Sequence, residues 1–163
     1  DLDHAVDTWQ WLLRLQPEAG LAPQLAALFH DIERLESEAR ERIEHRAPDY
    51  QTFKDAHAQK GAERAFEILL KAGVSQSDAE HARDLVCRHE RRAGDAEVLL
   101  LNDADALSFF SLNSPGYIDY FGLAQTRRKV AYTLSRLGVR AREKLDWVRL
   151  RPDVERLLRE VAA

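Results

Sequence analysis

The sequence lacks several features that mark specialised classes of protein. One cysteine, Cys87, stands among 163 residues, which excludes an intramolecular disulfide framework and fits a reducing compartment. No apolar run approaches the roughly 18 residues of a membrane span, and no signal peptide is recognisable. Methionine is absent and the chain opens at Asp1, so we expect residues to be missing before Asp1. These absences predict a cytoplasmic protein without membrane contact.

The sequence also lacks a basic excess. It carries 24 Lys and Arg against 28 Asp and Glu, a net charge of -4, which argues against a general nucleic-acid binder. Hydrophobic residues make up 45% and charged residues 32%, ordinary values for a soluble globular protein and too apolar for disorder. The length fits one domain over residues 1–163, with a buried core that needs no disulfide.

Strand signals are nearly absent, and the seven glycines and five prolines fall between periodic segments. Ala, Leu, Glu and Arg dominate, which predicts an all-α fold. The charged stretch Glu33–Arg46 is expected to extend the preceding helix and to lead into a loop at Ala47–Asp49. A turn is expected at Asn113–Gly116. The expected helices are about 3–16, one from Pro23, 55–72 with Gly73 as its C′ residue, one from Ser75 or Ser77 to 91, 96–112, 120–137 and one from 141 onwards.

Four histidines lie on apolar faces of expected helices, where an unpartnered polar group costs on the order of 1–3 kcal/mol. They are His4, His30, His57 and His89. His4 lies on the same helix face as Trp11, and His30 follows the apolar residues 26–29. His57 precedes a series of small residues that begins at Gly61, and His89 lies on the same helix face as Val86. The other two, His45 and His81, are expected to be solvated.

Carboxylates repeat this pattern in the segment 99–110, which is apolar on every side apart from Asn102, Asp103, Asp105 and Ser108. Such a helix is normally central and buried. Each aspartate or histidine taken alone is more often a hydrogen-bonded or ion-paired residue than a ligand. The set as a whole, on separate helices of one small domain, is the ligand mix of zinc, iron or manganese.

The order of these residues resembles the HD-domain metal-dependent phosphohydrolase superfamily. The resemblance rests on an early His4, the adjacent pair His30-Asp31, and Asp105 within Ala-Asp-Ala-Leu. His57 with the following Gly61-Ala62, and His89 within Cys-Arg-His-Glu, extend it, so that it covers about residues 1–112. Periodicity alone does not separate Asp103 from Asp105; the family register assigns Asp105.

The resemblance implies a ligand-bearing helical bundle over about 1–112, followed by C-terminal helices over about 116–163. It implies one or two divalent transition metal ions (Mn, Fe, Co, Ni or Zn). The implied metal ligands are His4, His30, Asp31 and Asp105 for a first ion, with His57 and His89 holding a second ion that Asp31 bridges. Many dinuclear relatives have a second histidine at the position of Arg88.

The implied activity is hydrolysis of a small phosphorylated compound, with a nucleotide as the expected class, by attack of a metal-activated hydroxide on phosphorus. Asp31 and Glu33 are the candidate catalytic residues, Glu33 either by orienting the attacking water or by holding a ligating imidazole. The alternative for Glu33 is a solvated helix end. Candidate phosphate contacts are Lys60, Arg88, Lys129 and Arg136.

Two other functions fit the same residues. Some relatives with this ligand order are di-iron oxygenases, and a non-catalytic metal-binding HD domain is the third reading. Tyr117 and Tyr120, around the expected Pro-Gly turn, either form a lid or stacking wall for a nucleotide or belong to a loop whose tyrosines pack onto the core.

Overall fold

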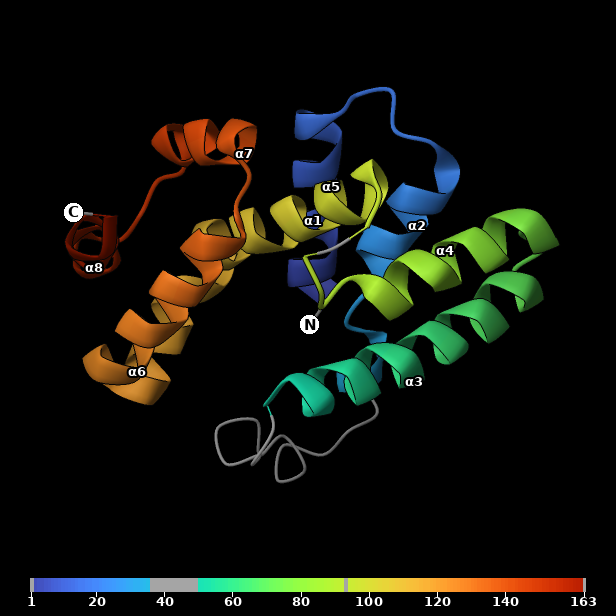
Figure 1. The fold of residues 1–163 in the computed structure, drawn as a ribbon, viewed down its shortest axis with the longest axis horizontal. Coiled ribbons are helices and arrows are strands. Elements are labelled where there is room, and N and C mark those ends of the chain that lie inside the picture. The colour runs from blue at the N-terminus through green and yellow to red at the C-terminus, as the bar shows by residue number, and fades with distance from the viewer. Residues whose placement is uncertain (1, 36–49, 93, 163) are drawn as a thin grey trace.

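The computed structural model describes residues 2–35, 50–92 and 94–162, and within them it contains helices and no strand (Figure 1). The all-α prediction is therefore confirmed for this part of the chain. Short turns η1, η4 and η5 accompany the α-helices. The elements are α1 Leu2–Leu15, α2 Leu21–Phe29, η1 Ile32–Leu35, α3 Tyr50–Lys71, α4 Gln76–Arg88, α5 Ala96–Ser108, η4 Phe109–Asn113, α6 Ser114–Arg136, α7 Val139–Glu143, η5 Lys144–Trp147 and α8 Pro152–Ala162.

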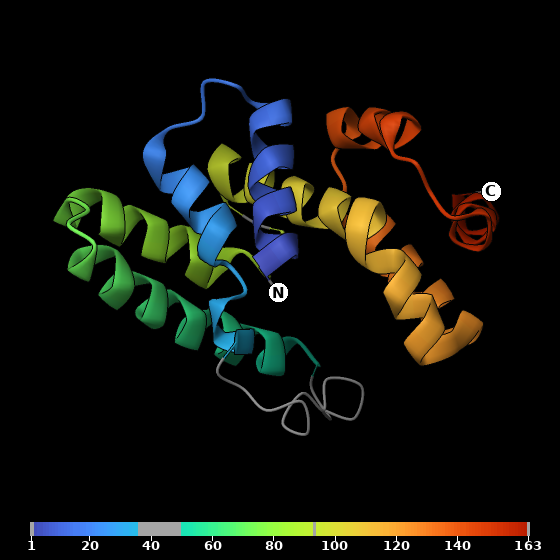
Figure 2. The same ribbon diagram turned by 180° about the vertical axis from the view of Figure 1, so that it is seen from behind.

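Helices α3 and α4 run side by side, α2 packs mainly on α4, and α1 packs on α2 and on α5, which leads on towards α6 (Figures 1 and 2). Small residues make this close approach of helices possible, among them the fully buried Ala58, Ala65, Ala79 and Ala82. Gly61 of α3 faces the end of α2, since a Cβ there would lie 3.6 Å from the carbonyl oxygen of His30. The small-residue face of α3 therefore brings His57 towards the His30-Asp31 pair.

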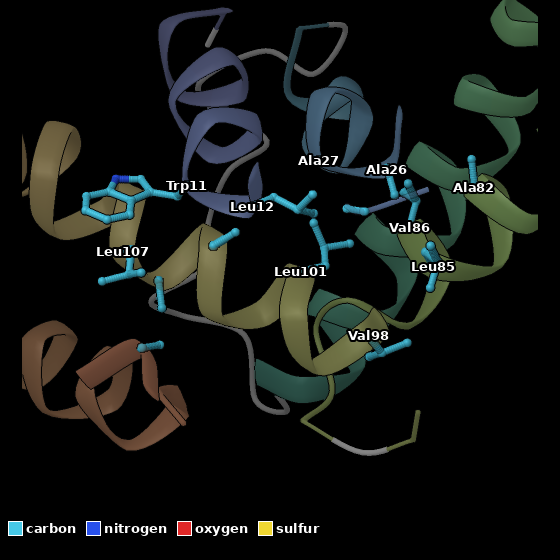
Figure 3. Packing of buried hydrophobic residues seen from close by; sticks show 14 of the residues in the cluster. Trp11, Leu12, Ala26, Ala27, Ala82, Leu85, Val86, Val98, Leu101 and Leu107 are labelled. Carbon is cyan, nitrogen blue, oxygen red and sulfur yellow. The ribbon is translucent and has the colours of Figure 1, made fainter. Parts of the chain in front are cut away.

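The hydrophobic core lies between α1, α2, α4 and α5 (Figure 3). Leu12 from α1 and Leu101 from α5 are fully buried, and Ala26 of α2 and Val86 of α4 complete the contact. Burial of each such leucine contributes about 1.5–3 kcal/mol. The core thus fixes four of the five helices that carry the histidines and carboxylates.

Two predicted helix boundaries are confirmed in atomic detail. Gly73 has φ 84° and its N–H bonds to the carbonyl of Leu70, while the N–H of Val74 bonds to that of Leu69, so α3 ends with glycine at C′. Ser75, one of the two serines proposed as a cap, accepts a hydrogen bond from the N–H of Asp78.

The predicted turn at Asn113–Gly116 is wrong. The chain continues from α5 through one π-helical turn, η4, directly into α6. Pro115 stands in the first turn of α6, where its missing N–H interrupts no helical hydrogen bond, and the Ser114 hydroxyl donates to the carbonyl of Phe110. The proline therefore starts a new helical segment where we expected a break.

The chain reverses instead at Gly122, which has φ 75° and ψ 175° inside α6. This conformation is nearly exclusive to glycine, so α6 is a hairpin of two helical arms, and the second arm returns towards α5 (Figure 1). Both tyrosines lie on the first arm and not in a loop: Tyr117 is half-buried against Phe109 and Phe121, whereas Tyr120 is 83% exposed. The expectation that both tyrosines pack onto the core is wrong for Tyr120.

Other boundaries differ by a few residues. Helix α2 begins at Leu21, two residues before Pro23, which still lies in its first turn; α3 begins at residue 50 instead of 55; and α4 ends at Arg88 instead of 91. Residues 32–35 form the turn η1, and the remainder of the charged stretch, with His45, lies outside the described residues. No helix among the described residues has the length and apolar character of a membrane span.

Candidate metal centre

Five helices bring six polar side chains to one place beside the core. The histidines are almost completely buried, with exposed fractions of 4% or less for three of them and 7% for His57. The aspartates Asp31 and Asp105 are more accessible, with side chains exposed by 17% and 20%. The contributing elements are α1 for His4, the end of α2 for His30 and Asp31, α3 for His57, the end of α4 for His89 and α5 for Asp105.

These side chains form two groups of metal donors that share one residue. In the first, donor atoms of His4, His30 and Asp31 all lie within 4.8 Å of one another; in the second, those of Asp31, His57 and His89 do. Asp105 borders the first group, with its Oδ1 at 3.3 Å from Nε2 of His4 and 3.6 Å from Nε2 of His30. Asp31 is thus the residue that belongs to both groups.

Each of the four histidines is held by its other ring nitrogen, Nδ1. Those of His30 and His89 donate to the carbonyls of the residues three positions earlier, Ala27 at 2.9 Å and Val86 at 2.7 Å. Both histidines end a helix, where carbonyls lack their usual partners four residues later; that of Val86 also accepts a long hydrogen bond, 3.4 Å, from the N–H of His89. A proton fixed on Nδ1 leaves the Nε2 lone pair for a ligand, the arrangement found at histidine metal sites.

The remaining two imidazoles are held by side chains. Nδ1 of His4 lies 2.9 Å from the hydroxyl of Ser108, which itself donates to the carbonyl of His4, and Nδ1 of His57 lies 2.6 Å from Oε2 of Glu33. The carboxylate of Glu33 can only accept, so His57 donates from Nδ1. Its Nε2 lies 3.1 Å from Oδ1 of Asp31. Glu33 therefore orients His57 towards the shared aspartate.

The buried Nε2 of His30 makes no hydrogen bond with any described residue. Burial disfavours a positive charge on this ring, but the negative charges of Asp31 and Asp105 outweigh burial and raise the pKa of His30 to about 9. Without a cation from outside, the ring therefore holds a proton between two carboxylates. A divalent metal fits this position because it supplies the same positive charge and also satisfies the unpartnered nitrogen.

Both carboxylates are ionised, as metal ligands must be. Burial opposes ionisation of Asp31, but Arg34, at 3.0 Å, and His30 hold its pKa well below the ordinary value. Burial likewise opposes ionisation of Asp105, but the adjacent imidazoles of His30 and His4 and the charge of Arg136 hold its pKa low. The donor set of imidazoles and ionised carboxylates thus fits a divalent transition metal.

Comparison with known proteins places the chain in a family. The family described as Domain of unknown function (DUF4202) matches residues 1–158. The chain belongs to this family. No curated protein and no solved structure matches the chain. The side chains of this DUF4202 protein are therefore the basis for assigning its chemistry.

The structure separates Asp105 from Asp103, which periodicity left open. Oδ1 of Asp103 accepts from the N–H of Gly138 at 2.8 Å and from Arg92 at 3.1 Å, on the opposite side of α5 from the histidines. Asp103 therefore links α5 to the start of α7, and Asp105 is the aspartate of α5 that borders the donor groups.

Two predicted substrate contacts do not lie at this cluster. Arg88 is partly exposed and pairs with Asp84 at 2.6 Å and Asp95 at 2.9 Å, because the residue after it, His89, takes the inward direction. Lys60 is exposed on α3 and makes no hydrogen bond or ion pair with the described residues of the cluster. His81 is exposed and bonds to Glu97, as expected for a solvated histidine.

A buried ion network next to the donor groups was missed by the sequence analysis. Lys54 of α3 and Arg136 of α6 both lie against the carboxylate of Glu90, the former in a short ion pair and the latter at 3.7 Å. Arg136 also donates to the carbonyl of His89 at 2.9 Å and to Oδ1 of Asn102. This network joins α6 to the end of α4, and its only sequence signal is Glu90 directly after a predicted ligand.

Proposed function

We propose that this DUF4202 protein is a metal-dependent phosphohydrolase of the HD type that acts on a small phosphorylated compound such as a nucleotide. The observation that carries the proposal is the pair of donor groups with Asp31 in common. A carboxylate between two sets of imidazoles suits two neighbouring divalent ions, an arrangement that recurs in phosphatases and nucleases.

The residues would hold the ions in two sets. His4, His30, Asp31 and Asp105 would bind one ion, and Asp31, His57 and His89 the other. Divalent ions bound in this way lower the pKa of coordinated water and neutralise the charge that develops on phosphoryl oxygens. The protein's own contribution is to fix the imidazoles through their Nδ1 atoms, so that their Nε2 atoms keep their positions.

Within this proposal Glu33 is a positioning residue. The sequence analysis named it as a catalytic candidate, either for water or for an imidazole. Its Oε2 accepts from Nδ1 of His57 at 2.6 Å, which supports the second of these roles. Asp31 keeps the central role, as the ligand common to both groups.

The cationic side chains around the cluster support an anionic substrate, such as a phosphorylated compound. Lys54 and Arg136 flank the donor groups from one side, and Arg34 lies 3.0 Å from Asp31 on another. Cationic side chains at a phosphoryl-transfer site bind the substrate and stabilise charge in the transition state.

We expect purified protein, stripped of metal and reloaded with Mn, Fe, Co, Ni or Zn, to bind up to two ions per chain and to release phosphate from p-nitrophenyl phosphate or from nucleotides. A chelator should abolish the release and the effective metal should restore it. Full metal loading with no hydrolysis across this panel would favour a non-catalytic domain. Oxygen consumption by the iron form would favour the oxygenase.

Replacing His57 by Ala is expected to lower the metal content from about two ions per chain to about one, because only the second donor group contains His57. The measurement is metal per chain by elemental analysis after gel filtration. His81→Ala is the matched control, since His81 is an exposed histidine that bonds to Glu97. An unchanged metal content in His57→Ala would contradict the second ion.

A further inference from the structure

One face of the second arm of α6 is directed at the candidate metal centre. Lys129, Tyr132 and Arg136 recur at spacings of three and four residues, so they share this face. Lys129 is half-buried, and the hydroxyl of Tyr132 accepts a hydrogen bond from Lys54. Arg136 lies 3.5 Å from Asp105. The reversal at Gly122 brings the second arm back beside α5 (Figure 1).

Three cationic groups surround the ring of Tyr132. Nζ of Lys54 lies 4.8 Å from the ring centroid, Cζ of Arg136 5.7 Å and Nζ of Lys129 5.8 Å. Two carboxylates, those of Glu90 and Asp105, lie against this group. Positive charge is therefore in excess, and it becomes larger when Asp105 is shared with a metal ion.

The excess is located on Lys129. Within the described parts of the chain Lys54 pairs with Glu90, and Arg136 with Glu90 and Asp105, whereas Lys129 has no carboxylate within ion-pair distance. Its Nζ lies over the ring of Phe109, at 5.5 Å from the centroid, so aromatic faces replace solvent around the ammonium group. A half-buried ammonium without a counter-ion is suited to bind an anion from outside.

Burial, together with repulsion by Lys54, lowers the pKa of Lys129, although Asp105 acts in the opposite direction. The charged form is therefore less stable in the free protein than in water. An anion that binds next to Lys129 reverses this effect, which makes binding of the anion more favourable.

We infer that Lys129 binds a terminal oxygen of the substrate's phosphate, and that the site therefore prefers a phosphomonoester dianion to a phosphodiester. The inference rests on the proposed function, since the remaining oxygens are assigned to the metal centre. A monoester has three terminal oxygens and close to two negative charges, whereas a diester has two oxygens and one charge. With two terminal oxygens assigned to the metal centre, a monoester has a third oxygen for Lys129, and a diester has none.

The test uses two non-reacting probes on metal-loaded and metal-free protein at about pH 8, where phosphonates and phosphates are mainly fully ionised. Methylphosphonate is a dianion with three phosphoryl oxygens, and dimethyl phosphate is a monoanion with two terminal oxygens. Binding is measured by isothermal titration calorimetry for the wild type, Lys129→Met and Lys71→Met. Lys71 is exposed at the end of α3, so its variant controls for the loss of one positive charge.

The wild type is expected to bind methylphosphonate more tightly than dimethyl phosphate. Lys129→Met should weaken methylphosphonate binding by about tenfold or more, weaken dimethyl phosphate binding much less, and leave the metal content unchanged. Lys129→Arg should retain most of the affinity, and Lys71→Met all of it. If the methionine variant does not fold, Lys129→Gln replaces it.

Methylphosphonate binding by Lys129→Met within about twofold of the wild type would overturn the inference. An equal loss in Lys71→Met, or no binding by the wild type with or without metal, would do the same. Failure of the proposed function is seen separately, in the metal content and phosphate release of the wild type. If the wild type takes up no metal, the titration of the metal-free protein still decides the role of Lys129.

Discussion

Replacing Asp31 by Ala is expected to remove both metal ions and to lower phosphate release by about a thousandfold or more. Asp31 is the residue that the two donor groups have in common. Its Oδ1 lies 3.1 Å from Nε2 of His57, and its Oδ2 lies 4.0 Å from Nε2 of His4 and from Nε2 of His30. Its loss removes a negatively charged ligand from each group. Metal per chain and phosphate release are the two measurements.

The fold should survive this substitution, because Asp31 lies between α2 and η1 and takes no part in the hydrophobic core. Far-UV circular dichroism should therefore be nearly unchanged. Asp31→Asn keeps the shape and removes the charge, so it should also lose metal. Asp103→Asn is the matched control: its Oδ1 can still accept from the N–H of Gly138, and it should keep both ions. Near-full metal occupancy in Asp31→Ala would contradict the shared-ligand role.

The sequence predicted the helical fold because the information is local. Periodic apolar residues and caps such as Ser75 and Gly73 determine where most helices lie and how they end. The Asn113–Gly116 turn was predicted wrongly for a physical reason. Proline and glycine together are typical of a break, yet proline is compatible with the first turn of a helix, and η4 absorbs the change of direction.

The candidate site was predicted in part for the same reason. A histidine on an apolar face, such as His30 or His89, is a local anomaly that a sequence displays. Which face of α5 points towards the histidines depends on contacts with other helices. Because α5 is apolar on every side, its sequence does not indicate this face, so Asp103 and Asp105 could be separated only by the resemblance or by the structure. The ion pair of Arg88 with Asp84 could be predicted from their spacing of four residues on one helix.

The buried ion network could not be predicted, because it joins residues that are distant in the sequence. Lys54, Glu90 and Arg136 come from three helices, and each is of a type usually found at the surface. Only the return of the second arm of α6 brings Arg136 to the end of α4. Hydropathy patterns contain no information about such a contact.

Replacing Glu90 by Gln is expected to lower the free energy of unfolding by about 3 kcal/mol, since it leaves Lys54 and Arg136 buried together without a carboxylate between them. Glutamine keeps the volume, so loss of charge is the main change. Chemical denaturation of the metal-free protein measures the effect. Glu67→Gln is the control, because Glu67 forms an exposed pair with Arg64 and its loss should cost less than about 1 kcal/mol.

The effect of Glu90 should depend on pH in a defined direction. Burial opposes ionisation of Glu90, but the adjacent His89 and the positive charges of Lys54 and Arg136 lower its pKa below the ordinary 4.5. A carboxyl with a lowered pKa stabilises the fold above its ordinary value and loses this stabilisation as the pH falls through the folded-state pKa. The difference between wild type and Glu90→Gln should therefore be full at neutral pH and shrink in acid below pH 4.5. A difference that stayed constant in acid would mean that packing, and not charge, accounts for the loss of stability.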